Sequence, residues 1–148
     1  ANSFCLSADV TAAYDPNFDS VYEKRNAARV NHGLCLCKYT GARGKSGGFH
    51  VFVIPVEKEL DLKKAAKASG EKSVEMVHVK ELLGLTGYVR GGCSPVGMKK
   101  AFPTVFDESV LNVPTVMVSA GKIGYQVECT PADLIGLVRA QTAAITTE

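Results

Sequence analysis

Apolar positions in the N-terminal third predict a helix followed by a β-hairpin. Residues 1–17 show no firm periodicity. From Ser20, which has capping-box spacing to Glu23, apolar residues recur at helical spacing and predict an amphipathic helix that ends at Gly33. Two runs rich in Leu, Val, Ile, Phe and Cys follow, at 34–40 and 49–56, and they predict two antiparallel strands. The glycine-rich stretch between them, at 41–48, predicts a flexible hairpin tip.

The rest of the chain alternates between short helices and short strands. Asp61 is a candidate N-cap of a helix that stops at Gly70. Thr130, followed by Pro131, marks the start of a C-terminal helix. The remaining pattern predicts a brief strand at 73–76, a short helix at 77–85 and β-branched strands at 104–107, 113–119 and 125–129, with a frayed tail from Ala143.

Together these elements predict one mixed α/β domain of the α+β kind over residues 1–148. A chain of 148 residues suits one hydrophobic core, and no linker or repeat divides it. We expect a mixed, mostly antiparallel sheet of about six strands with helices packed on it.

Composition restricts the class of protein. Apolar residues make up 46% of the chain and charged residues 22%, and no apolar run is long enough to span a membrane. The N-terminal residues lack the features of a secretory signal, and the five cysteines are odd in number without zinc-like spacing, so we expect a cytoplasmic protein with reduced thiols. A net charge of +2 predicts that any nucleic-acid partner contacts a small footprint.

The stretch at 87–100, called the glycine loop below, is the candidate site. Its sequence is Gly-Tyr-Val-Arg-Gly-Gly-Cys-Ser-Pro-Val-Gly-Met-Lys-Lys. Four glycines and one proline are poorly compatible with a packed helix or strand, and they favour a rigid loop with free N–H groups.

The cysteines allow two interpretations. Cys35 and Cys37 lie two apart on a predicted strand, so a thiol pair is conceivable, although a role as small apolar core residues is favoured. Cys93 lies inside the glycine loop and would need a nearby cation or base, such as His50 or His78, to act as a nucleophile. Three scattered histidines argue against a metal site, and no cofactor is expected.

Three lysines are candidate binding residues. Lys38 lies mid-strand and shares a strand face with the apolar Leu36, an unusual place for a lysine unless it binds a negatively charged oxygen. Lys99 and Lys100 follow the glycine loop, where they could meet a phosphate.

The glycine loop resembles the signature of the YbaK/EbsC family of aminoacyl-tRNA deacylases, which is related to the editing domain of prolyl-tRNA synthetase. Further segments fit that family in order, and the resemblance covers roughly residues 50 to 140, whereas the first 33 residues match poorly. These segments are 62–67, 74–76, 118–121 and 127–134.

The resemblance implies hydrolysis of the ester that joins a wrong amino acid to tRNA, with Cys-tRNA(Pro) as the expected substrate. It also implies an essential lysine on a strand before the first hairpin turn. Lys38 occupies that place, but its neighbours Cys37 and Tyr39 depart from the family pattern and leave Lys45 as a second candidate.

The family's Gly-x-x-x-Pro element corresponds to residues 91–95. A tetrahedral oxyanion could be stabilised there by the N–H groups of Gly91 and Gly92. No Ser-His-Asp set is evident, so a water or the substrate's own thiol is the expected attacking group. The remaining candidates are the substrate-binding Cys93, Ser94, Pro95, Ser119 and Gly121, and the tRNA-binding Lys99 and Lys100.

Two rival functions stay open on the sequence. One is a non-catalytic module that binds tRNA or a synthetase, and the other is a thiol enzyme that uses Cys93. The expected partner is the acceptor end of a mischarged tRNA, with prolyl-tRNA synthetase as a further candidate and no membrane. A monomer or weak homodimer is expected.

Overall fold

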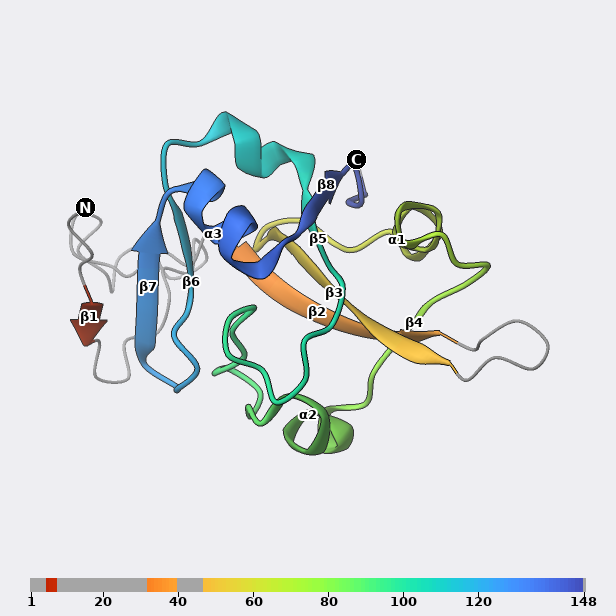
Figure 1. Cartoon of the computed structure of the whole chain (residues 1–148), viewed down its shortest axis with the longest axis horizontal. Helices are drawn as coiled ribbons and strands as arrows, with labels where there is room; N and C mark the ends of the chain where they lie inside the picture. The colour runs from red at the N-terminus through yellow and green to blue at the C-terminus, as the bar shows by residue number, and fades with distance from the viewer. Residues whose placement is uncertain (1–4, 8–31, 40–46, 148) are drawn as a thin grey trace, which may run out of the picture.

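A computed structural model describes residues 5–7, 32–39 and 47–147 (Figure 1). The helices are α1 (Leu62–Ser69), α2 (Val79–Thr86) and α3 (Pro131–Val138), with a 3₁₀ turn, η2, at Glu108–Asn112. The strands are β1 (Cys5–Ser7), β2 (His32–Tyr39), β3 (Gly48–Pro55), β4 (Glu75–Met76), β5 (Thr104–Asp107), β6 (Val116–Ser119), β7 (Tyr125–Cys129) and β8 (Gln141–Ala143).

The strands of the described part form two sheets. The larger has the order β4-β2-β3-β5-β8, in which β3–β5 and β5–β8 are parallel pairs and the others antiparallel. The smaller has the order β1-β7-β6 and is antiparallel throughout. The predicted mixed, mostly antiparallel α+β fold is confirmed, although the strands divide between two sheets instead of forming one of about six.

Local capping explains where the helices begin and end. The Asp61 carboxylate accepts hydrogen bonds from the N–H groups of Lys63 and Lys64, and Gly70 ends α1 with a φ of 74°. Both caps were predicted from the sequence. In α3 the Thr130 hydroxyl accepts the N–H of Asp133, and the helix ends at Arg139 in the left-handed conformation.

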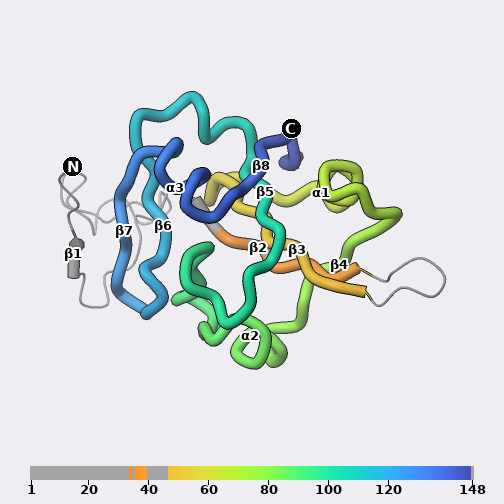
Figure 2. Tube along the Cα trace, viewed as in Figure 1, coloured from red at the N-terminus to blue at the C-terminus, as the bar shows by residue number. Residues whose placement is uncertain are grey.

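The larger sheet has a hydrophobic core on each face, because successive side chains of a strand point to opposite sides. On β3, Val51 and Val53 belong to a cluster that includes β6 and α3. Phe52 and Ile54 belong to a second cluster that includes Ala65 of α1. The glycine loop leaves α2 and runs to the β6–β7 turn, on the side of the first cluster (Figure 2).

The predicted frayed tail is wrong. Ile145 is fully buried in the second cluster. Its N–H donates to Asp107 Oδ1 over 3.1 Å, and its carbonyl accepts the N–H of Asp61 over 2.9 Å. A buried isoleucine with both backbone groups bonded fixes the C-terminal segment against α1 and β5.

The helix predicted to end at Gly33 lies mostly outside the described residues. His32 and Gly33 themselves belong to β2, so the predicted end is wrong at this point. The hairpin tip at 41–48 also lies outside the described residues up to position 46. The hairpin strands are confirmed by the antiparallel β2–β3 register. Within the described part, no helix combines the length and the apolar character needed to cross a membrane.

Candidate active site

The two ends of the glycine loop are joined by hydrogen bonds around Thr86. Thr86 is buried, and its hydroxyl donates to the carbonyl of Leu82 over 2.8 Å while accepting the N–H of Tyr88 over 3.0 Å. Its carbonyl accepts the N–H of Lys99 over 3.0 Å. The loop therefore starts and ends at one buried residue, which limits its freedom.

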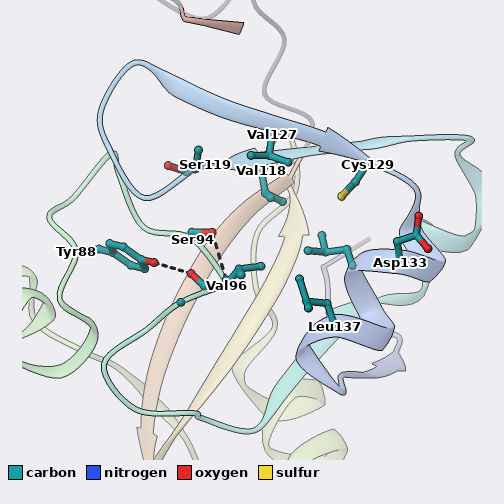
Figure 3. Close-up of a pocket in the computed structure, with 12 residues that line it drawn as sticks. Tyr88, Ser94, Val96, Val118, Ser119, Val127, Cys129, Asp133 and Leu137 are labelled. Atoms are coloured by element: carbon teal, nitrogen blue, oxygen red, sulfur yellow. Dashed lines mark hydrogen bonds between the residues drawn. The ribbon is translucent and has the colours of Figure 1, made fainter. Parts of the chain in front are cut away.

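The interior of the loop is fixed by Tyr88. The Tyr88 hydroxyl donates to the carbonyl of Val96, whose N–H donates to Ser94 Oγ over 3.2 Å (Figure 3). The tyrosine ring also packs on Gly121 of the β6–β7 turn, where an added Cβ would lie 2.8 Å from Tyr88 Cε1. These contacts make one rigid unit of the glycine loop and the β6–β7 turn.

The residues 89–92 form a tight turn. The Gly92 N–H donates to the carbonyl of Val89 over 3.0 Å, so it is already used in this conformation. A Cβ on Gly92 would lie 3.2 Å from the backbone N of Ile123, a contact tight enough that the facing β6–β7 turn would have to shift slightly. The Gly91 N–H makes no hydrogen bond within the described part of the chain, and Gly91 has a φ of 88°.

Two cavities open beside the loop. The first has a volume of about 380 Å³ and is mostly apolar, with the polar side chains of Tyr88, Ser94, Ser119 and Asp133 at its wall (Figure 3). Val118, Val127, Cys129, Leu134 and Leu137 provide the larger apolar surfaces. Apolar walls with a few polar groups are typical of a small-molecule site.

The second cavity is about 350 Å³ and more polar. Lys100 and Arg139 are the charged residues in its wall, and no carboxylate lines it. Val96, Gly97 and Leu137 line both cavities, so the two adjoin along the second half of the glycine loop.

The structure brings together part of the predicted site. Ser94 and Ser119 line the first cavity, while Pro95 and Lys100 line the second. Gly91, Gly92, Cys93, Gly121 and Lys99 line neither cavity. Gly121 still contributes, because its lack of a side chain admits the Tyr88 ring, and Gly87 likewise lies against the Lys99 side chain.

Lys38 lies on the sheet face of the first cluster. It follows Leu34 and Leu36 at every second position of β2, and both leucines pack in that cluster. Its Nζ is 3.3 Å from Glu75 Oε1 on the neighbouring β4. Lys38 lines neither cavity, and Lys45 lies outside the described residues.

The thiols are poorly suited to act as nucleophiles. Cys93 Sγ donates to the carbonyl of Val89 over 3.4 Å, and burial raises the pKa of this thiol. In the first cavity, burial and the Asp133 and Glu128 carboxylates raise the pKa of the Cys129 thiol. A raised pKa disfavours the thiolate, which is the nucleophilic form of cysteine.

The histidines named as possible bases lie elsewhere. His50 is buried, its Nε2 is 3.6 Å from Glu71 Oε1, and alternation on β3 places it with Phe52 on the opposite sheet face from the loop. His78 is exposed at the start of α2. Cys37 is a core residue, as favoured from the sequence. Across the described ranges, no group of three His, Cys, Asp or Glu side chains could hold a metal.

Sequence reasoning missed several cavity residues. Asp133 was interpreted only as part of a helix start, although this residue also lines the first cavity. Arg139 gave no signal, since its place beside Lys100 depends on how α3 packs. Tyr88 could have been found, because an aromatic residue inside a glycine loop is a candidate anchor.

Comparison with known proteins connects this site to one family. The model of the "Aminoacyl-tRNA editing domain" matches residues 27–137. The chain is 53% identical over 105 residues to the "Putative Cys-tRNA(Pro)/Cys-tRNA(Cys) deacylase EbsC" of Enterococcus faecalis. That match covers 71% of this chain and 64% of the relative, slightly less than two thirds of its length.

A shorter match is to a protein of a different name, an aminopeptidase. Over 46 residues the chain is 59% identical to the "Probable M18 family aminopeptidase 1" of Clostridium acetobutylicum, covering 31% of this chain and 10% of that protein.

A solved structure, "Crystal structure of a putative trans-editing enzyme for prolyl tRNA synthetase", has a TM-score of 0.79 at 22% identity, covering 99% of this chain and 87% of its own. At that identity it supports the fold alone.

The family match spans the glycine loop, the β6–β7 hairpin and most of α3, which together build the first cavity. The chain belongs to the aminoacyl-tRNA editing domain family.

Proposed function

We propose that this protein hydrolyses the ester bond of a mischarged aminoacyl-tRNA, with Cys-tRNA(Pro) as the first substrate to test. The observation that carries the proposal is the pair of adjoining cavities on the glycine loop, one mostly apolar and one cationic. Family membership and the relative named as a deacylase support it. The proposed partner is the acceptor end of tRNA, and prolyl-tRNA synthetase is a further candidate partner.

The first cavity suits a small aminoacyl group. Its apolar wall can bury a short side chain, and the Asp133 carboxylate can pair with the α-ammonium group of the amino acid. Ser94 and Ser119 offer hydroxyls to the ester oxygens or to a substrate thiol. The fit of one or a few methyl groups sets which amino-acid side chain is preferred, and each such group adds only a small amount of binding free energy.

The attacking group is proposed to come from the substrate or the solvent. Burial raises the pKa of both Cys129 and Cys93, which disfavours the nucleophilic thiolate form of each. For Cys-tRNA, the substrate thiol can attack its own carbonyl carbon. The sulfur gives up its proton and forms a C–S bond, the C–O bond to the ribose breaks, and the ribose oxygen takes up a proton. Free tRNA and a cyclic thioester of cysteine result, and a water then opens the thioester to cysteine. For other aminoacyl groups a water attacks.

Gly91 and Lys38 are proposed electrostatic contributors. Gly91 lines neither cavity, so its N–H, which makes no hydrogen bond among the described residues, donates to the oxyanion only if the ester carbonyl lies outside the first cavity. The Gly92 N–H is held by Val89. Lys38 lines neither cavity, and its Nζ lies against Glu75 Oε1. It contacts substrate only if Nζ leaves Glu75 and binds a substrate oxygen instead. In this account Lys38→Ala lowers kcat/KM, and Glu75→Gln, which frees the lysine, does not.

The test is release of amino acid from a panel of charged tRNAs that includes Cys-tRNA(Pro), Ala-tRNA(Pro) and Pro-tRNA(Pro). We expect acceleration over buffer for at least one mischarged species and none for Pro-tRNA(Pro). Tight tRNA binding without turnover would identify a non-catalytic module and overturn the proposal. Loss of activity on alkylation of Cys93 alone would favour the thiol-enzyme alternative.

A further inference from the structure

The second cavity has a cationic wall to which the proposed function assigns no particular part of the substrate. Two cations, Lys100 and Arg139, come from different parts of the chain and line one cavity without a lining carboxylate. Neither side chain forms an ion pair within the described residues, although acids pair with Lys38 and His50 elsewhere in this sheet. Two unpaired cations in one concave wall favour an anionic ligand.

Arg139 occupies a backbone conformation that resists it. Its φ of 52° and ψ of 42° are left-handed, and it is the one residue other than glycine with positive φ in the described ranges. The position ends α3, where glycine is the usual residue. An arginine is strained there, and strain of this kind is often retained where a side chain has a function.

A structural explanation for Arg139 also exists. A cation near a helix C-terminus interacts favourably with the exposed carbonyls of the last turn. That explanation requires only a positive charge near α3 and does not require that the residue line a cavity with Lys100. The two explanations therefore differ in their consequences for ligand binding.

The two cavities share one wall, formed by Val96, Gly97 and Leu137. An aminoacyl ester has its apolar side chain on one side of the carbonyl and a phosphate-bearing nucleotide on the other. If the aminoacyl group fills the first cavity, the second cavity is the adjoining space for the nucleotide. The second cavity, at about 350 Å³, is within the size range of small-ligand sites.

We propose that the second cavity is the subsite for the 3′-terminal nucleotide of the tRNA, with Arg139 and Lys100 binding its phosphate. This rests on the proposed deacylase function. Arg139 then contributes as a fork of N–H donors and Lys100 as a point charge. The ester carbonyl lies beside Gly97, whose N–H makes no hydrogen bond among the described residues and is a further candidate oxyanion donor.

The experiment measures binding of an uncharged RNA minihelix that ends in the CCA acceptor sequence, at several salt concentrations. The full chain is compared with Arg139→Gly and Arg139→Asn, two replacements that tolerate the left-handed backbone but remove the charge. Lys72→Gln is the matched control, because Lys72 is an exposed lysine beside α1 and lines neither cavity.

We expect both Arg139 variants to bind the minihelix about 5- to 50-fold more weakly. The slope of log K against log salt concentration should fall by about 1, the loss of roughly one phosphate contact. Arg139→Gly should also raise the melting temperature, because it relieves the backbone strain. Better folding with weaker binding is not expected of a purely structural residue.

The outcomes separate this subsite from the deacylase proposal. If both Arg139 variants bind with the affinity and salt slope of the unchanged protein, the subsite is overturned, whether or not the protein deacylates. If the variants lose binding while the unchanged protein shows no turnover, the subsite stands and the deacylase proposal fails. If the unchanged protein does not bind the minihelix, the subsite is overturned.

Discussion

The hydroxyl of Tyr88 donates a hydrogen bond to the carbonyl of Val96, eight residues further along the glycine loop. Because Tyr88 and Val96 lie on different arms of the loop, this bond joins the two arms. Val96 lines both cavities, and the Tyr88 ring packs on Gly121 of the facing turn. The Tyr88 hydroxyl therefore helps to set the shape of the proposed site, together with the hydrogen bonds of Thr86 and Ser94.

Tyr88→Phe removes that bond with little change in volume. We expect the free energy of unfolding to fall by about 1 kcal/mol, since a net hydrogen bond contributes about that much. We also expect kcat/KM for deacylation to fall by about 10-fold as the wall at Val96 loosens. Urea unfolding and steady-state kinetics measure the two effects.

The matched control is Tyr125→Phe. Tyr125 is partly exposed, and its hydroxyl makes no hydrogen bond among the described residues. An equal loss of activity in both variants would show that the Tyr88 bond has no special role in the loop.

Gly121→Ala tests the close contact between the β6–β7 turn and the Tyr88 ring. Gly121 has a φ of 93°, and an added Cβ would lie 2.8 Å from Tyr88 Cε1. We expect destabilisation of about 1–3 kcal/mol from backbone strain and displacement of the ring. Chemical denaturation measures it.

Gly84→Ala is the contrasting substitution. Gly84 lies inside α2, and a Cβ there meets nothing within 4 Å. We expect stabilisation of about 0.5–1 kcal/mol from helix propensity. Similar effects at both glycines would contradict the packing argument.

Leu137→Ala tests the wall shared by the cavities. Leu137 lines both cavities and is 68% exposed, so its truncation should change stability little. We expect kcat/KM to fall by about 3- to 10-fold, because about 1 kcal/mol of apolar contact with substrate is lost. Leu111→Ala is the control, since Leu111 is 63% exposed and lines neither cavity. A loss of the same size at Leu111 would contradict the assignment.

Asp107 is expected to stabilise the C-terminal segment in a pH-dependent way. Burial alone raises the pKa of its carboxyl, but hydrogen bonds from Ser109 and Ile145 outweigh burial and hold the pKa below its usual value. Because the unfolded carboxyl has a pKa of about 3.9, the stabilisation is present above about pH 4 and is lost as pH falls through the folded pKa.

Asp107→Ala leaves the buried N–H of Ile145 without its acceptor. We expect a loss of about 2–4 kcal/mol at pH 7, with the gap to the unchanged protein narrowing at pH 3. Urea unfolding at both pH values is the measurement. Glu108→Ala, at the exposed neighbour, serves as control. A gap that does not narrow at pH 3 would show that ionisation of Asp107 contributes nothing.

Local chemistry in the sequence predicted much of this fold. Asp61 and Gly70 identified both ends of α1, and Thr130 with Pro131 identified the start of α3. These signals involve atoms within a few residues of one another, so sequence order contains them. Ile145 was misjudged because its burial depends on residues far away in sequence, such as Ala65 of α1, and its N–H donates to Asp107, 38 positions earlier.

The site was predictable only in part for the same reason. The glycine loop stood out, and Ser94 and Ser119 do line one cavity. The second cavity could not be foreseen, because Lys100 and Arg139 meet only through the packing of α3. The Gly92 N–H was proposed as a free donor, and only the turn geometry shows that Val89 accepts it.

The most direct test of the central claim is single-turnover hydrolysis of Cys-tRNA(Pro) with the protein in excess. We predict that the ester is cleaved at least about 10-fold faster than in buffer, with Pro-tRNA(Pro) left intact, and that Asp133→Asn slows the reaction. Cleavage at the buffer rate for Cys-tRNA(Pro) and every other mischarged tRNA in the panel would contradict the account.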